Sequence, residues 1–570
     1  MRMGDAKVTG ARTVSTVTGR ITRRAFGGAV GTAGLLAFGL AGVRWPGSRT
    51  PGQPGGQLPS RAPLPGAYRL PFVVPPLARP VRSDATTDYY EITQQEASLQ
   101  ILPGLRTPLW TYGGTFPGPT VVSRTGRRTV VRHTNELPAP VVVHLHGGHV
   151  PSGSDGFPTD ALLPVGAGPE EYGGQVATQD GTRTVLGPTG RRAGAGNDGG
   201  AVGAFLGTTP DPAATIVSGS RDYIVPPQRR SASLWYHDHR MGFTGRSMWR
   251  GLLGLHLVVD DADESLGLPQ GERDLPVLIC DRTFGEDGSL TYPFTGPMQA
   301  AGHTMATPYM DGVLGDVILV NGVPWPRLEV AGARYRLRLV NGSNARAYAL
   351  ALDPPPPGGG ALVQVGSDGG LLERPLARDQ VALAPGERCD VVVDFARYAP
   401  GARVELVNLA GSGSTRQVML FEVGARSRDA SRVPARLSTI AAHDPARAVV
   451  TRQLAFQRYG GLGGRWTING ETFDPRRVAA RPRLGDLEVW RLSSDVAHPV
   501  HLHLEQFQVL ARAGTRPGPD DHGWKDTVSL RPGEALDIAV RFTDYAGRFL
   551  VHCHNVEHED MGMMATIETW

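Results

Sequence analysis

The chain has 570 residues, 40% of them hydrophobic, and a formal net charge of +4. Its first 43 residues hold six basic residues and one acidic residue, which leaves a net charge of −1 for the remainder. This near-neutral remainder gives no reason to expect binding to nucleic acid or to an anionic membrane. The length suggests about three or four domains, and 75 glycines with 47 prolines favour a turn-rich all-β protein.

The N-terminus has the pattern of an export signal. Arg23 and Arg24 precede an apolar stretch, Ala29 to Gly42, that is short and glycine-rich for a membrane span. This pattern resembles a twin-arginine leader, so residues 1–43 are predicted to direct export to the cell envelope or beyond, without stable membrane insertion. An uncleaved anchor behind a chance arginine pair is the alternative. Residues 44–81 are predicted to form a disordered or extended Pro/Gly-rich tether.

Short apolar runs separated by turn residues fill the rest of the chain. Examples are TVVSRTGRRTVV, VVVHLHGG, YRLRLVNG, RCDVVVDF and RFLVHCH. No stretch has the periodicity of a long amphipathic helix. Many short strands at this spacing are typical of β-sandwiches and Greek-key barrels. The runs fall into three blocks, residues 82–262, 270–425 and 450–570, which we interpret as three domains.

A glycine-rich span with weak periodicity, residues 163–220, interrupts the first block. Such a length without regular pattern predicts a long surface insertion, which is either a lid or a plain spacer. Farther along, Cys280 and Cys389 lie in apolar, strand-like runs and are predicted to be buried free thiols. A disulfide between them stays open, because pairing cannot be read from the sequence.

Ten of the 16 histidines fall into four clusters. The clusters are His144 and His146; His237 and His239; His498, His501 and His503; and His552, His554 and His558. Each contains the pattern H-x-H, which on a strand places two imidazoles on one face. One such pair is weak evidence, since surface pairs and zinc sites also show it. Four pairs supply eight imidazoles, too many for one tetrahedral zinc but suited to a cluster of three metal ions.

Strand alternation predicts a second site behind the first. Cys553 lies between His552 and His554, so its side chain points to the opposite face. His498 precedes His501 by an odd number of residues and can face the same way as Cys553. With His558 and a distant Met563, these residues match the trigonal His₂Cys site with a weak thioether that is typical of blue-copper centres. Met561 and Met564 are the alternative thioethers.

These clusters, in this order, resemble the copper-ligand motifs of the multicopper oxidases. The likeness is greatest to the branch of spore-coat laccases, bilirubin oxidases and phenoxazinone synthases, and it runs from about residue 85 to the end. The strings that carry it are HLHGGHVPSGSDGFP, SLWYHDHRMGFT, ILVNGVPWPRLEV, QVGSDGGLL, HGWKDTV and HCHNVEHEDMGMM. The insertion and the leader depart from that branch.

The resemblance implies three cupredoxin-like Greek-key β-barrel domains and four copper ions per chain. The type 1 copper, in the third domain, would be held by His498, Cys553, His558 and Met563. The trinuclear cluster would lie between the first and third domains: His144 and His501 at the type 2 copper, and His146, His237, His239, His503, His552 and His554 at the type 3 pair. Electrons would enter through His558 and pass through Cys553 to the cluster, where dioxygen is reduced to water.

Two acids match positions assigned to proton delivery in the same branch. Asp155 lies in the SGSDGFP loop, and Glu559 directly follows His558. Carboxylates near a metal cluster can pass protons from solvent to bound oxygen species. The alternative is that both acids only cap turns, since Asp beside Gly is a common turn signal.

The resemblance therefore predicts a laccase-like oxidase whose substrates are dioxygen and a small phenolic or aminophenolic reductant. The runner-up is a cuprous or manganous oxidase involved in copper tolerance. Such enzymes tend to carry methionine-rich segments, whereas this chain has only a thin group at Met298, Met305 and Met310. The complete ligand set argues against an electron-transfer cupredoxin, a copper nitrite reductase and a cupredoxin-fold protein without metals.

Overall fold

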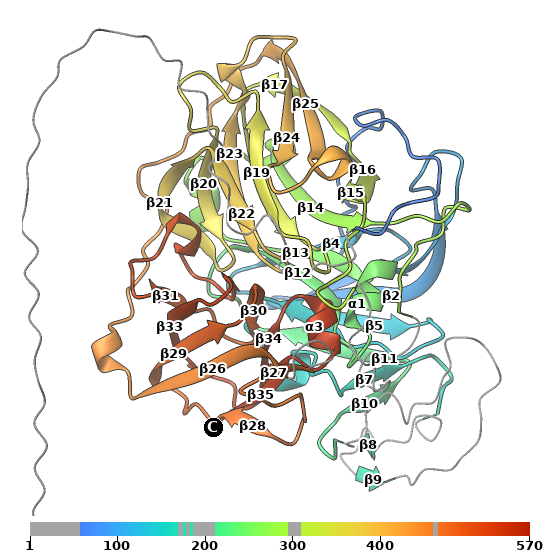
Figure 1. Cartoon of the computed structure of the whole chain (residues 1–570), viewed down its shortest axis with the longest axis vertical. Helices are drawn as coiled ribbons and strands as arrows, with labels where there is room; N and C mark the ends of the chain where they lie inside the picture. Colours follow the sequence, from blue (N-terminus) through green and yellow to red (C-terminus); the bar gives the residue numbers. More distant parts are fainter. Residues whose placement is uncertain (1–56, 169–174, 178–182, 186–210, 295–308, 460–464) are drawn as a thin grey trace, which may run out of the picture. The chain divides into compact units, whose positions relative to one another are not determined.

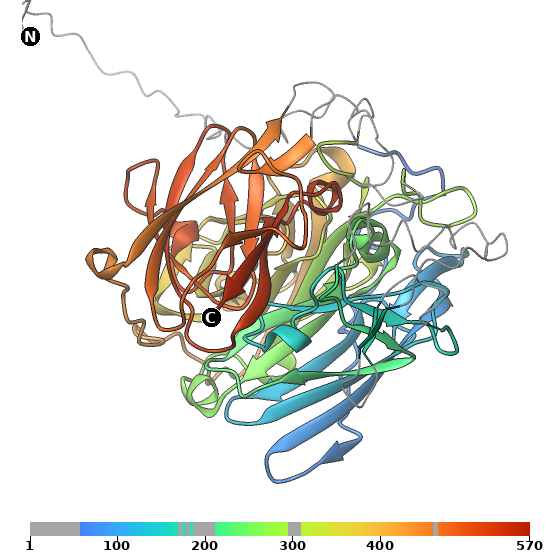
Figure 2. The same cartoon turned by 90° about the horizontal axis from the view of Figure 1, so that it is seen from below.

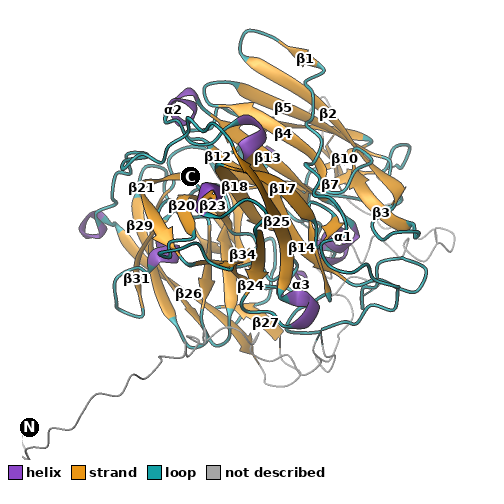
Figure 3. Cartoon of the chain, turned by 90° about the horizontal axis from the view of Figure 1, so that it is seen from above, coloured by secondary structure: helices purple, strands orange, loops and turns teal. Residues whose placement is uncertain are grey.

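The computed structural model describes residues 57–168, 175–177, 183–185, 211–294, 309–459 and 465–570 (Figure 1). All of them belong to one compact unit, Trp45–Trp570. The predicted leader, residues 1–43, lies outside the described residues, as do Met298 and Met305. Strands dominate and the few helices are short (Figure 3). Within the described ranges, no helix has the length and apolarity needed to cross a membrane.

The first block forms two main sheets and two small ones. The first sheet has the order β1 (Arg82–Ser83), β2 (Thr87–Leu99), β5 (Arg128–Asn135), β11 (Ser220–Val225), with β3 (Thr107–Tyr112) also on β2. The second has the order β4 (Gly118–Arg124), β13 (Leu253–Val259), β12 (Ala232–Asp238), β6 (Val143–His146). The small sheets pair β7 (Ala161–Leu163) with β10 (Ile216–Ser218), and β8 (Gln175–Ala177) with β9 (Arg183–Val185).

The middle block also forms two sheets. One has the order β16 (Val323–Pro324), β15 (Val317–Val320), β14 (Asp274–Arg282), β18 (Arg334–Asn341), β23 (Arg388–Asp394), β20 (Leu362–Ser367), β21 (Gly370–Arg378). The other has the order β17 (Arg327–Gly332), β25 (Gln417–Arg426), β24 (Arg403–Asn408), β19 (Tyr348–Asp353), β22 (Gln380–Leu383). The continuous apolar run Val391–Val393 of β23 is buried on both faces of the sheet.

The last block repeats the arrangement. One sheet has the order β27 (Arg465–Ile468), β26 (Val450–Tyr459), β29 (Leu487–Ser494), β33 (Ala535–Arg541), β31 (Gln508–Arg512). The other has the order β28 (Val478–Ala480), β35 (Met564–Thr569), β34 (Gly547–Cys553), β30 (His498–Leu502), β32 (Thr527–Leu530). Trp466, Trp490 and Phe549 fill the core between these sheets. Each such buried side chain contributes about 1.5–3 kcal/mol to stability.

A separate apolar cluster joins the first and last blocks. Phe157 and Met241 from the first block pack against Phe473, Leu550 and Met564 from the last. Figure 2 shows the C-terminal strands, in red, beside the N-terminal strands, in blue to green. Because this contact is apolar and buried, it holds together the two blocks that carry the histidine clusters.

Three short α-helices are present among the described residues: α1 (Thr244–Arg250), α2 (Asp261–Ser265) and α3 (Val556–Asp560). The helix α3 follows Cys553, in a stretch whose sequence shows no helical periodicity. The N–H groups of Thr244 and Gly245 at the start of α1 donate to the Asp560 carboxylate at 2.8 Å. This contact fixes α3, and with it His558, against the first block.

Both ends of the predicted insertion, residues 163–220, belong to the fold. Leu163 ends β7, and the parallel partner of β7 is β10. Asp211 is buried and accepts from Arg548 Nη1 at 2.9 Å. Of the remainder, residues 169–174, 178–182 and 186–210 lie outside the described residues. The predicted span thus contains three-residue strands, which weak apolar periodicity does not reveal, and its assignment as an insertion stays a prediction. The predicted domain boundaries as a whole stay a prediction.

The second half of the predicted tether is extended and fixed in place, whereas residues 44–56 lie outside the described residues. Ser60 N–H donates to the Asp316 carboxylate at 2.7 Å, and the Tyr68 hydroxyl donates to Glu405 at 2.9 Å. These side-chain partners come from the middle block, so the sequence of the tether alone could not show them. Cys280 and Cys389 are buried free thiols, as predicted.

Candidate metal centre

One group of metal-binding side chains lies inside the last block. Cys553 Sγ is 3.4 Å from His498 Nδ1 and 3.6 Å from His558 Nδ1, and the two nitrogens are 3.2 Å apart. All three side chains are buried. Two imidazole nitrogens and a thiol sulfur this close together could be ligands of one metal ion. The structure thus brings these three predicted residues together.

The strand register explains how Cys553 and His498 meet. Val500 of β30 lies opposite Cys553 of β34, so their side chains share one face of the sheet. His498 precedes Val500 by two residues and points to the same face. The helix α3 then returns His558 to that face. His501 lies opposite His552, and this pair points to the other face.

Met563 lies on the Cys553 face. The Cys553 N–H donates to the Met563 carbonyl at 3.1 Å, and both side chains pack in the core of the last block. Met564 lies opposite His552 in the register and packs in the apolar cluster between the first and last blocks. Met561 only borders the core of the last block. Of the three methionines, Met563 is therefore the one whose side chain shares the buried surroundings of the thiol.

Aromatic and polar neighbours hold the two imidazoles of this group. The Trp466 indole stacks on His558 with ring centroids 3.8 Å apart. The Asn555 side-chain nitrogen lies 3.3 Å from His558 Nε2, and Asp495 lies 3.5 Å from His498 Nε2. In both histidines the Nδ1 atom is thus left to face the thiol. Partners on the far side of a ligating imidazole fix its tautomer and orientation.

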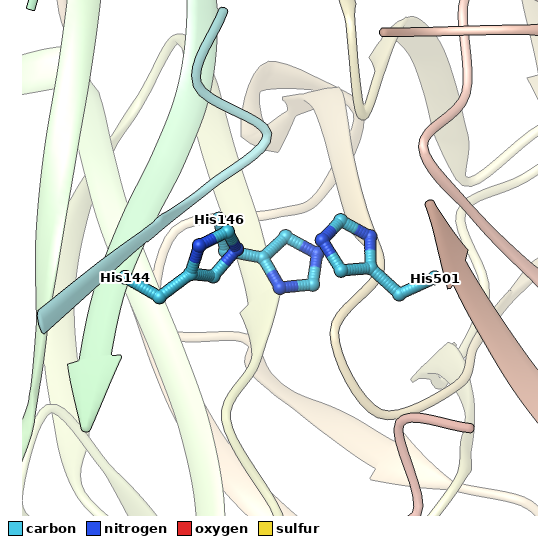
Figure 4. A group of neighbouring side chains, drawn as sticks. All are labelled: His144, His146 and His501. Atoms are coloured by element: carbon cyan, nitrogen blue, oxygen red, sulfur yellow. The ribbon is translucent and has the colours of Figure 1, made fainter. Parts of the chain in front are cut away.

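The second group comprises the eight remaining H-x-H histidines, at the seam between the first and last blocks. They are His144, His146, His237, His239, His501, His503, His552 and His554, and all are buried. His144 lies opposite His237 in the β6–β12 pair, as His501 lies opposite His552 in the β30–β34 pair. Figure 4 shows the rings of His144 and His501 pointing toward each other from opposite strands, with His146 between them. Residues about 350 positions apart in the sequence thus form one site.

The eight histidines divide into sets that each suit one metal ion. Ligand atoms of His146, His237 and His554 lie within 4.8 Å of one another, as do those of His239, His503 and His552. The remaining two, His144 and His501, are grouped with His146 by the same criterion. This division matches the two type 3 sites and the type 2 site that the resemblance implies, although their occupation by copper stays a proposal.

In three of these histidine rings, hydrogen bonding occupies one nitrogen and leaves the other available to bind a metal ion. One nitrogen of each ring is held by a protein oxygen at 2.5–3.0 Å: His144 by the Asp155 carbonyl, His237 by the Asp238 carbonyl and His501 by the Asp526 carbonyl. Among the described residues, no hydrogen-bond partner lies near the other nitrogen, Nε2, of these three rings. A buried, unsatisfied acceptor is costly. Metal binding would satisfy all three.

Burial also favours the neutral form of four of the eight imidazoles. It is the largest cause that lowers the pKa of His237 and of His239 to about 3. It likewise lowers the pKa of His503 and His552 well below the usual value. A metal ion binds the neutral ring, so no proton has to leave these residues at neutral pH. The site is therefore electrostatically suited to a cation before any cation arrives.

The two predicted acids lie beside the histidine cluster. Asp155 Oδ2 is 2.8 Å from His503 Nδ1. Glu559 Oε2 is 3.2 Å from His552 Nδ1, and its Oε1 accepts from the Thr244 hydroxyl at 2.6 Å. Burial raises the pKa of both carboxyl groups. Both side chains contact imidazoles, so turn capping does not account for them.

Sequence reasoning missed three residues that support the cluster. Asp526 and Thr527 contact His146 and His501, and Arg388 contacts Asp526. Asp526 and Thr527 belong to HGWKDTV, one of the strings that carry the family resemblance, so the sequence did contain an indication that these two residues matter. Nothing near Arg388 in the sequence indicates that its side chain reaches the seam.

The comparisons with known proteins agree with this geometry. Two family models described as multicopper oxidase match residues 93–202 and 443–569. The chain is 33% identical to a laccase of Bacillus subtilis, over 87% of this chain and 97% of that protein. It is 30% identical to a bilirubin oxidase of Albifimbria verrucaria, over 87% of this chain and 80% of that protein. A multi-copper oxidase of Pediococcus acidilactici superposes with a TM-score of 0.73 at 30% identity, covering 92% and 96% of the two chains.

These matches confirm the predicted fold class. Solved multicopper oxidases consist of three cupredoxin-like domains, and this chain has three pairs of β-sheets in the same order. The histidine clusters lie in the first and last pairs. The middle pair supplies none of the eight histidines at the seam, which makes its contribution to the site a separate question.

Proposed function

We propose that this chain, which belongs to the multicopper oxidase family, oxidises small phenolic or aminophenolic compounds and passes their electrons to dioxygen. It is a laccase-like, copper-dependent oxidoreductase that uses dioxygen as acceptor. The observation that carries the proposal is the segment His552–Cys553–His554. Its cysteine faces one metal-binding group and its histidines face the other, so three consecutive residues join the two groups covalently.

Copper, when bound, supplies one-electron redox chemistry and the reduction of dioxygen. His498, Cys553 and His558, with Met563 as weak fourth ligand, would hold the type 1 ion. His144 and His501 would hold the type 2 ion, and His146, His237, His239, His503, His552 and His554 would hold the type 3 pair. Four ions per chain follow from this assignment.

The protein surrounds the type 1 residues so that water is kept out. Only 2% of His558 is exposed, and the Trp466 ring covers one of its faces. We propose His558 as the residue through which electrons enter, because it is the most exposed of the three, at 2% against 0% for His498 and Cys553.

Asp155 and Glu559 are proposed to deliver the protons that dioxygen reduction consumes. Each contacts an imidazole of the cluster, and each is buried. A carboxyl group whose pKa is raised by burial holds its proton at a pH where an ordinary carboxyl group has lost it. Such a group can donate a proton at a higher pH than an ordinary carboxyl group.

The first test is the copper site itself. The loaded protein is expected to contain four copper ions per chain and to be intensely blue, because the blue colour requires thiolate bonded to Cu(II). Cys553→Ser should lose the colour and all turnover yet keep copper at the histidine cluster. Cys280→Ser, which removes a buried thiol of the middle block that belongs to neither group, is the matched control and should stay blue. A single copper, or zinc alone, by elemental analysis would falsify the oxidase assignment.

Oxygen uptake identifies the class of reductant. We expect uptake with phenols and an aminophenol, and with bilirubin if large pigments reach His558. Cu(I) should be a poor substrate by comparison, since Met310, the one described member of the methionine group, is buried in the core of the last block. Uptake with Cu(I) or Mn(II) alone would replace the phenol oxidase with the metal-ion oxidase.

Met563→Leu is expected to keep the blue colour and raise the type 1 reduction potential. A thioether stabilises Cu(II) more than Cu(I), and the axial ligand is a known determinant of this potential. Met564→Leu is the control, because Met564 packs on the opposite face of the strand. Redox titration of both variants separates them. A shift in Met564→Leu with none in Met563→Leu would reverse the assignment.

Asp155→Asn and Glu559→Gln should leave reduction of the blue copper by substrate close to normal. Reoxidation by dioxygen is expected to slow by about 100-fold, a usual contribution of a positioned acid. The deficit should grow as pH rises, because solvent protons then replace the missing donor less well. Glu488→Gln, at a buried acid paired with Arg452, is the control. Stopped-flow reoxidation equal to the parent at every pH would move the proton path elsewhere.

A further inference from the structure

A buried network of charged side chains lies directly behind the histidine cluster. Its members are Arg388, Asp368 and Glu387 from the middle block and Lys525 and Asp526 from the last block, and all five are buried. Lys525 Nζ lies 2.9 Å from Glu387 and 3.0 Å from Asp368. Charged groups at this depth are costly unless paired. Here each charged group has a partner of opposite charge, which offsets the cost of burying it at the seam.

Arg388 is the centre of this network. Its side chain is fully buried, and both guanidinium ends reach the Asp526 carboxylate, one of them at 2.6 Å from Nη1 to Oδ1. Its remaining N–H groups donate to the carbonyls of Ser233, Gly386 and Asp368 at 2.9–3.1 Å. Every donor of the guanidinium is thus used. A side chain held at this many points cannot change rotamer, and it fixes the plane of the Asp526 carboxylate.

Asp526 and Thr527 in turn contact two histidines and restrict the orientation of their rings. Asp526 Oδ1 is 3.3 Å from His146 Nε2, and the Thr527 hydroxyl oxygen is 3.0 Å from the same nitrogen. The Asp526 carbonyl accepts from His501 Nδ1 at 3.0 Å. Because these neighbours are acceptors, the proton of each ring lies on the nitrogen that faces them. The other nitrogens, His146 Nδ1 and His501 Nε2, are the ones without partners among the described residues.

The two rings need this support because they come from different blocks. His146 is the last residue of β6 in the first block, and His501 lies in β30 of the last block. Their rings nevertheless stack, with centroids 3.7 Å apart and an angle of 13° between the ring planes. Stacking alone leaves each ring free to slide and turn in its plane. The backbone after His146 also lies against the network: a Cβ on Gly147 would collide with Arg388 and Asp526. Gly147 has φ of 81°, which glycine adopts without strain.

We propose that Arg388, Asp526 and Thr527 form a clamp by which the middle domain positions His146 and His501 for metal binding. Arg388 is a positioning residue: it touches neither ligand atom and acts through Asp526. The inference rests on the proposed function, since it takes His501 as a type 2 ligand and His146 as a type 3 ligand. It assigns to the middle domain, which supplies none of the eight histidines, the task of setting the two rings that meet across the seam.

The planar fork of arginine, more than its charge, is what the clamp requires. A lysine at position 388 keeps the charge but offers one point of attachment, so Asp526 is free to rotate. Arg388→Lys is therefore expected to weaken copper binding at the type 2 site by about 10–100-fold, the usual cost of losing a partner behind a metal ligand. The type 1 site, which does not touch the clamp, should keep its blue absorption.

The experiment compares the parent, Arg388→Lys and Arg346→Lys after copper loading and dialysis against a graded chelator. Arg346→Lys is the matched control, because Arg346 is a buried arginine of the same domain that pairs with Asp281 at 2.8 Å. Copper per chain and the electron paramagnetic resonance signals of type 1 and type 2 copper are recorded. Selective loss of the type 2 signal in Arg388→Lys, with the blue band intact and the control unchanged, supports the clamp. Equal retention in Arg388→Lys and the parent overturns it.

Thr527→Val decides the matter if Arg388→Lys does not fold. It removes one neutral hydroxyl at nearly constant volume and leaves the ion pair intact, so the folded protein is expected to persist. The clamp predicts altered type 2 hyperfine splitting and weaker copper retention, whereas an unchanged spectrum and affinity overturn the clamp. A parent protein that binds no copper at the histidine cluster would instead refute the proposed function, so the two failures are distinguishable.

Discussion

The pleat of a single strand is the constraint on which the site depends. At the end of β34, consecutive side chains must point to opposite faces, so Cys553 enters the core of the last block while His552 and His554 enter the seam. A shift of one residue in the β30–β34 register would exchange these faces and separate every ligand from its partners. The register is fixed because Val500 and Cys553 are buried on one side, and His501 and His552 on the other.

The second constraint is the cost of placing charged groups where solvent does not reach them. Eight imidazoles are buried within contact of one another, and burial lowers the pKa of seven of them. Around them lie carboxylates in two different states. Asp155 and Glu559 have a raised pKa, whereas Asp526 has a pKa held below its usual range by Arg388, against the effect of burial. Carboxyl groups whose pKa values are shifted in opposite directions thus surround the same cluster.

Much of this arrangement could be predicted from the sequence. Strand periodicity and the spacing of the four histidine clusters predicted two back-to-back groups, because parity is a local property. The all-β fold followed from composition and from the motifs. Contacts between distant segments could not be predicted in this way. The link from Arg388 to Asp526, the stacking of Trp466 on His558, and the attachment of Ser60 to Asp316 of the middle block all depend on tertiary packing. The short helix α3 was also missed, since five residues are too few to show helical periodicity.

The seam between the first and last blocks has a consequence for biosynthesis. His144, His146, His237 and His239 leave the ribosome long before His501 and the residues that follow it, so the early half of the site has no partner while the chain is being made. The final methionines and histidines lie within the last twenty residues. Metal captured before translation ends would meet half a coordination sphere, in a block whose apolar face at Phe157 and Met241 is still uncovered. Correct metallation is therefore a late event, and a chain interrupted near its C-terminus yields a β-rich fragment that cannot complete either site.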